Sequence, residues 1–202
     1  MKLRAISAMF LWLALGLGLA TPAAADDDDI RIIRGEVQDD VFVAGERVDI
    51  DAEIGGDVFA AGGTVTTSGR IADALVAAGG RLSLASNVEG DAVVAGGDVT
   101  ISGAIGDNLV AAGGDVVISG PVAGRAIAAG GSILLDNSAA TGRDAWFAGG
   151  EITVRGVVGG DLRIAAGKAT VLGQIGGDVV IRSDDVRIGP GARIAGTLTV
   201  RG

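Results

Sequence analysis

The chain has no cysteine, no histidine and no tyrosine, and aromatic residues make up only 3% of its 202 positions. The absence of cysteine excludes a disulfide-stapled scaffold. Without histidine or cysteine, the chain also lacks the side chains that most often serve as general bases, nucleophiles and metal ligands. We therefore expect a protein that is not an enzyme and that uses no cofactor.

Basic residues are scarce as well: 16 Lys and Arg stand against 25 Asp and Glu, a formal net charge of −9. Because nucleic-acid binding needs a basic face, this balance argues against nucleic acid as a partner. The chain is not a disordered one, since 49% of its residues are hydrophobic and its mean hydropathy is +0.49. Its length suits one domain with a sizeable core.

The long apolar run of the sequence lies at its N-terminus. Lys2 and Arg4 precede an apolar segment at residues 5–20, and residues 21–25 end in an Ala-x-Ala pattern. This order is typical of a secretory signal peptide, so we expect residues 1–25 to be removed. The mature protein would then be exported to the periplasm, the cell envelope or the extracellular space. The alternative is an uncleaved N-terminal anchor.

The remainder is dominated by a repeat. An Ala-Gly-Gly unit returns every 17 residues, and its first Gly serves as a landmark for one repeat, which we call a rung. Every step of the series is 17 residues except one step of 19: Gly45, Gly62, Gly79, Gly96, Gly113, Gly130, Gly149, Ala166 and Ser183. A fixed short period of this kind indicates a solenoid.

The side chains around each landmark indicate strands. Positions four and two before the landmark, and three and five after it, are apolar in every rung except at Thr67, and the spacing of two within each pair is that of a strand with one face buried. A further aliphatic position nine after the landmark marks a short third side. We therefore predict an all-β fold, a parallel three-sided β-helix with 17-residue rungs and Gly-rich corners, roughly 40 Å long at 4.8 Å per rung.

Three regions follow from this pattern: a signal peptide at 1–25, an acidic lead-in at 26–39 and the β-helix domain at 40–202. Within the lead-in, Ile30 to Gly35 would form an additional strand or an imperfect cap. We expect the inserted residues near Asp136 to bulge from a corner, since extra residues of a solenoid go to its turns.

Two outward-facing columns of side chains invite a functional interpretation. Five before the landmark, Asp and Asn recur, either holding the corners through bonds to backbone N–H groups or forming a calcium ladder. Three before it lies a nearly continuous apolar column, which we expect to be an interaction face for lateral association or membrane-surface contact, unless it only reflects the preference of strands for β-branched residues. Its members are Phe42, Phe59, Val76, Val93, Val110, Ile127 and Trp146. A Thr-rich surface like that of β-helical ice binders is confined to Thr64 and Thr66.

The corners, as in Val88-Glu89-Gly90-Asp91 and Val158-Gly159-Gly160-Asp161, together with the short rungs and the Ala-Gly-Gly series, resemble the bactofilins. Bactofilins are polymer-forming cytoskeletal proteins, and the resemblance covers residues 40–202. It implies a right-handed β-helix that polymerises end to end without nucleotide. The sequence departs from the cytoplasmic bactofilins by its apparent signal peptide.

We therefore expect a structural protein of the cell envelope that self-associates into filaments or oligomers through the open ends of its β-helix. The segment from Gly196 to Gly202 begins another rung, and its apolar residues Leu198 and Val200 would form the polymerisation end. Two alternatives are an adhesion or binding module that uses the apolar face, and a β-helical enzyme acting on polysaccharide, which would need a cleft.

Overall fold

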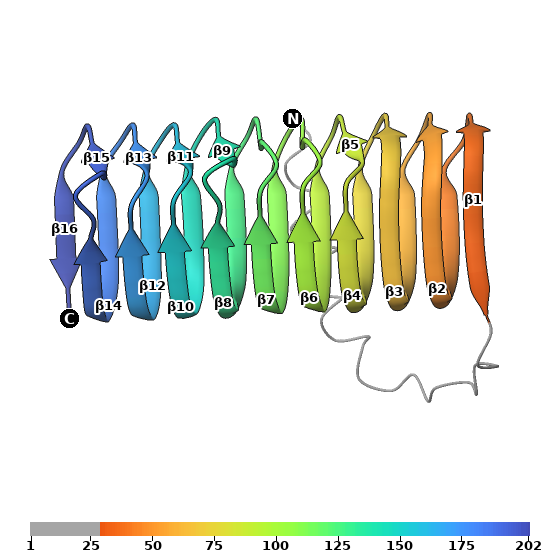
Figure 1. The fold of residues 1–202 in the computed structure, drawn as a ribbon. Coiled ribbons are helices and arrows are strands. Elements are labelled where there is room, and N and C mark those ends of the chain that lie inside the picture. The colour runs from red at the N-terminus through yellow and green to blue at the C-terminus, as the bar shows by residue number, and fades with distance from the viewer. Residues whose placement is uncertain (1–28) are drawn as a thin grey trace, which may run out of the picture.

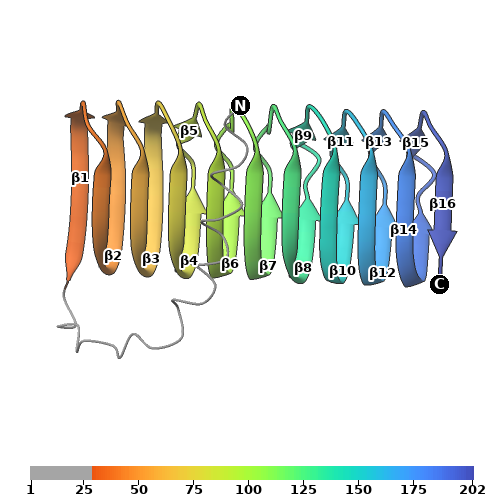
Figure 2. The same ribbon diagram turned by 180° about the vertical axis from the view of Figure 1, so that it is seen from behind.

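The computed structural model describes residues 29–202, and the expected signal peptide lies outside the described residues. The described chain is built from strands alone, stacked in successive coils along one straight axis (Figures 1 and 2). Within this part there is no helix of the length and apolar character that a membrane span requires. The predicted all-β solenoid is confirmed.

Three kinds of strand make up the coil. Nine long strands each begin four residues before a landmark: β2 Val41–Ile54, β3 Val58–Ile71, β4 Leu75–Leu84, β6 Ala92–Ile101, β7 Leu109–Ile118, β8 Ala126–Leu135, β10 Ala145–Val154, β12 Leu162–Val171 and β14 Val179–Ile188. Five strands have two residues each: β5 Asn87–Val88, β9 Ala140–Thr141, β11 Val157–Val158, β13 Gln174–Ile175 and β15 Arg193–Ile194. Two further strands lie at the ends of the rod, β1 Ile30–Val37 and β16 Leu198–Arg201.

All pairings between these strands are parallel, and the register follows the repeat. Val65 pairs with Leu82, Leu82 with Val99, and Val99 with Val116, so equivalent residues stack in one file. Each long strand bends at its landmark, where six of the nine carry Gly-Gly, and therefore supplies the first and second sides of the coil. The third side is formed by the C-terminal ends of β1, β2 and β3 in the first rungs and by the two-residue strands in the later ones, with isolated bridges at Ile105 and Val122 where no strand forms.

The inward-facing columns form one continuous apolar core. Leu75 and Val65 are fully buried on the first and second sides of their rungs, and Ile71 is fully buried on the third side. Thr67, the one polar residue in these columns, is also fully buried, and its Oγ1 lies 2.8 Å from Oγ of Ser86, which is 1% exposed. A buried hydroxyl pair satisfies both groups, which explains how a polar residue is tolerated there.

Small residues fill a further inward column, seven residues after the landmark, which the sequence analysis did not single out. At Gly103, an added Cβ would lie 1.9 Å from the carbonyl oxygen of Ser86, and at Gly120 it would lie 2.0 Å from that of Gly103. At this corner the backbones of adjacent rungs stack too closely for any side chain on these residues. The column is therefore restricted to small residues by the turn of the coil.

The predicted insertion lies at a corner, as expected. The backbone N–H of Ala139 donates to the carbonyl oxygen of Asp136 at 3.0 Å, which closes a turn before β9. The same turn recurs before β15, where the N–H of Ala192 donates to the oxygen of Gly189 at 3.1 Å. Both insertions leave the register of the following side intact.

The expected lead-in contains a regular strand. Along its whole length β1 pairs with the second half of β2, from Ile30 opposite Arg47 to Val37 opposite Ile54. The coil is therefore already formed ten residues before Asp40, and Ile33 and Val37 pack against the core.

Candidate interaction surfaces

The acidic column five before the landmark links one rung to the next. Oδ1 of Asp40 accepts the backbone N–H of Asp57 at 2.9 Å, and Oδ1 of Asp57 accepts that of Ala74 at 2.8 Å. The same bond runs from Asp178 to Asp161 at 2.9 Å. The carboxylates therefore hold backbone N–H groups, as the structural interpretation predicted, but the N–H belongs to the residue 17 positions later and not to their own corner.

These bonds account for the carboxylates without a metal ion. Among residues 29–202 no group of three or more acidic side chains is placed to hold one, so the calcium interpretation finds no support there. The column is interrupted at Ala74 and Arg125, which receive a bond but have no side-chain acceptor to continue it. Arg125 donates instead from Nη2 to Oδ2 of Asp144, at 3.3 Å.

The predicted interaction face lies on the outside of the first side of the coil. Its residues, from Phe42 to Trp146, stack in register along the rod, and we call them the outer apolar column. Phe42 is 73% exposed, and its ring stacks on that of Phe59 with centroids 4.7 Å apart. The other members of the column are only half-buried by their neighbours. The structure thus brings these side chains together in one row on the outside of the coil.

Beside this row runs a second one, which we call the alanine column. It consists of exposed residues one before the landmark: Ala44, Ala61, Ala78, Ala95, Ala112, Ala129, Ala148 and Ala165. Near β2 to β4 the two columns enclose a shallow apolar depression, lined among others by Phe42, Phe59, Val76 and Ala78. The face therefore has relief, with a ridge of larger side chains next to a shelf of methyl groups.

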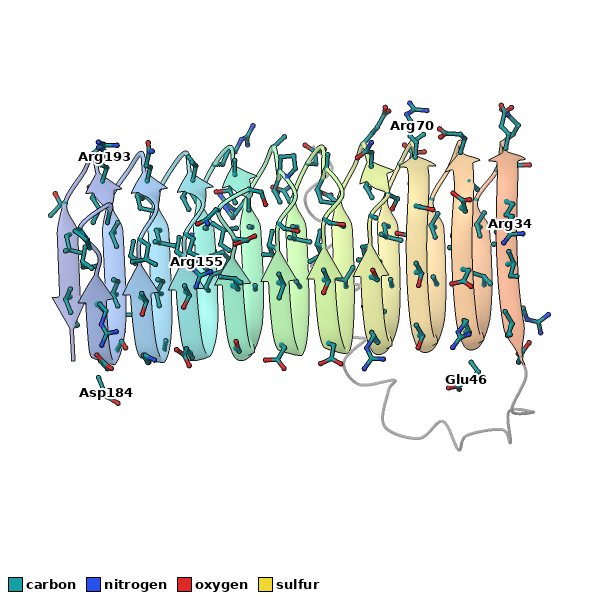
Figure 3. All side chains as sticks on the ribbon, in the orientation of Figure 1. Arg34, Glu46, Arg70, Arg155, Asp184 and Arg193 are labelled. Carbon is teal, nitrogen blue, oxygen red and sulfur yellow. The ribbon has the colours of Figure 1, made fainter. Side chains whose placement is uncertain are left out.

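Trp146 ends the outer apolar column toward the C-terminal end of the rod. The guanidinium groups of Arg125 and Arg163 lie 4.8 Å and 5.3 Å from its ring centroid, in cation–π contact from the two adjacent rungs. The next residue of the column is Arg163 itself, so the apolar row stops there. Charged side chains also project from other parts of the coil: in Figure 3, Glu46 and Asp184 lie at the bend that follows the landmark, and Arg70 and Arg193 lie at the opposite edge.

The two ends of the described rod are both incomplete, in opposite ways. At one end β1 covers the second half of β2 but nothing in residues 29–202 covers its first half. At the other end β16 covers the first half of β14, from Val179 to Arg182, and the second half of β14 pairs with β12 on one side only within the described chain. The predicted end residues Leu198 and Val200 are 41% and 48% exposed.

Sequence reasoning missed several residues at these ends. Arg31 pairs with Val48 and so stands in a column that is apolar in every later rung, where it forms an ion pair with Asp29 at 2.9 Å. Ile188, which is 38% exposed, and the half-buried Ile194 lie at the other end. Counting 17 residues back from Val48 would have identified Arg31.

The corners of the described chain carry no insertion longer than two residues, so the long loops that a β-helical polysaccharide enzyme would use are not formed there. Comparison with known proteins adds nothing to this geometry, because no family model, no curated protein and no solved structure matches the chain.

Proposed function

We propose that the protein is a non-enzymatic structural protein of the cell envelope, exported by its N-terminal segment, that polymerises end to end through the two ends of its β-helix. The observation that carries this proposal is the complementary shape of the ends. Within residues 29–202, one end lacks the first half of a rung and the other lacks the second half. When the C-terminal end of one copy meets the N-terminal end of the next, β16 and β1 together make one complete rung.

The same register that runs through the rod can continue across this joint. The apolar contacts that it creates are Leu198 with Val41, Val200 with Val43, Ile188 with Ile33, and Ile194 with Val37. Each of these residues stands in an inward column, so the joint extends the core from one copy into the next. The unpaired backbone groups of both end strands would be satisfied at the same time, which is the usual driving force for strand addition at an open edge.

Some charged residues at the joint favour end-to-end joining and one opposes it. Glu36 and Arg193 occupy the same column on the third side, so they approach as an opposite pair across the joint. Arg31 opposes joining, because it places a charge in an inward column, next to Val186 of the neighbouring copy. We expect this one unfavourable contact to keep the polymer reversible.

The joint is heterologous, since it brings together two different ends. A head-to-tail contact along a straight axis does not close into a ring, and it produces an open filament. Each copy contributes nine complete rungs and one shared rung, which at 4.8 Å per rung gives an axial repeat of about 48 Å.

Electron microscopy of the chain from Asp26 onward tests the proposal. We expect unbranched filaments without added nucleotide, with an axial repeat of about 48 Å. Sedimentation should show a critical concentration below which the protein is monomeric. Particles that stay monomeric over a wide range of concentration would contradict the proposal.

A further inference from the structure

The outer apolar column and the alanine column together form a face that fits a second copy of itself. We propose that two rods pair side by side, in parallel, with the outer apolar column of each seated on the alanine column of the other. This inference concerns a different surface from the end-to-end joint. It extends the proposed function, because the paired rods would belong to paired filaments.

The relief of the face determines the arrangement. Two faces can be related by a two-fold axis that lies between them, either along the rod or across it. An axis across the rod would place the two outer apolar columns against each other and leave a gap between the two alanine columns. An axis along the rod reverses the order of the two columns in the partner, so that the larger side chains of each copy, such as Val93, meet the methyl groups of the other, such as Ala95. Close packing therefore favours parallel rods.

Charge favours a second copy over a membrane surface as the occupant of this face. The acidic column, with Asp57, Asp91 and Asp161, runs directly beside the outer apolar column. The chain after residue 25 carries 14 basic and 25 acidic residues, a net charge of −11. An anionic lipid surface would face the acidic column as well as the apolar one, whereas in a parallel rod pair the two acidic columns lie at opposite rims, apart from each other and in water.

The buried area indicates how strongly two rods would pair. The apolar face extends over the seven rungs from Phe42 to Trp146, and a four-residue strand is about 13 Å long, so each copy covers roughly 450 Å². A pair therefore buries roughly 900 Å², just below the size of a stable interface. Two isolated rods should pair weakly, and rods joined into a filament should pair firmly, because the contacts add along its length.

Parallel pairing is compatible with growth of the filament. Both rods of a pair present the same end in the same direction, so the next copies can add to both. In an antiparallel pair, the N-terminal end of one rod would lie beside the C-terminal end of the other. A parallel pair of rods could therefore not add to both of them at once.

Disulfide trapping tests the pairing, because the chain has no cysteine of its own. The single variants Val93→Cys and Ala95→Cys are mixed in equal amounts and oxidised. Parallel pairing predicts disulfide-linked dimers that contain one of each, in excess over the homodimers by about tenfold, the ratio that 1.4 kcal/mol of preference supplies. The matched control is Ser83→Cys, which is exposed on the second side of the preceding rung and should not cross-link above background.

The same mixture in a Val200→Arg background separates this inference from the proposed function, because that substitution weakens the end-to-end joint and leaves the outer apolar column and the alanine column unchanged. Cross-linking that persists there supports the lateral pairing even if no filaments form. Three results would overturn it: homodimers of Val93→Cys as the main product, cross-linking no faster than the Ser83→Cys control, or loss of cross-linking when vesicles of phosphatidylglycerol capture the protein.

Discussion

The substitution Val200→Arg tests the end-to-end joint most directly. Val200 lies on β16 with its side chain 48% exposed, and the joint would bury the exposed half against Val43 of the next copy. Burying half of a valine side chain contributes about 1 kcal/mol. An unpaired guanidinium forced into the same inward column costs at least about 2 kcal/mol more. The joint should therefore weaken by about 3 kcal/mol, which raises the critical concentration for filament growth roughly a hundredfold.

Sedimentation of the filaments at a series of protein concentrations measures this shift. The matched control is Thr199→Arg, the neighbouring residue on the same strand, whose side chain alternates to the outside of the coil. That variant should polymerise like the unmodified protein. The reasoning is refuted if both variants shift the critical concentration equally, or if neither does. Both variants should keep the thermal stability of the rod, because β16 lies at the end of the described rod and three of its four residues are exposed.

Three further predictions concern the rod itself. Gly103→Ala should lower the free energy of unfolding by about 2 kcal/mol in chemical denaturation, because the new Cβ meets a carbonyl oxygen, whereas Gly191→Ala, with its nearest neighbour at 3.8 Å, should be neutral. Asp91→Ala removes two hydrogen bonds to Asn108, of 2.9 and 3.0 Å, and should lower the free energy of unfolding by about 1 kcal/mol. The control Asp115→Ala, on the second side, should leave the free energy of unfolding unchanged. Calcium should not change the melting temperature of the unmodified protein. Arg31→Val removes the charge from an inward column and should lower the critical concentration for polymerisation; an unchanged or higher value would count against the joint as drawn.

The sequence was most informative about the structure in the regions where successive rungs carry equivalent residues. Columns of apolar residues at fixed positions from the landmark predicted the strands, the inward faces and the register, because stacking in a solenoid places equivalent residues on top of each other. The same rule placed Thr67 in the core, but not Ser86, whose hydroxyl makes that burial acceptable. A single exception in one column gives no indication of which neighbouring rung supplies its partner.

The acidic column shows a second limit. From the sequence, Asp57 and its equivalents were expected to bond within their own corner, since nearby backbone groups are the usual partners of Asp in turns. In the folded rod each carboxylate points along the axis and accepts an N–H group from the next rung. The two residues are 17 positions apart in the chain, or 19 for Asp178 and Thr197, and only the stacking of the rungs brings them into contact.

What the sequence by itself determined is therefore the content of each rung: which residues face inward, where the corners lie and which column is apolar on the outside. These properties are local and periodic, and strand alternation and glycine spacing are enough to derive them. The tertiary structure alone decided how the described part of the coil begins and ends, since β1 and β16 are recognised as half-rungs only once they are seen against β2 and β14. The complementary shape of these ends, on which the proposed function depends, is a property of the stack as a whole and of no single repeat.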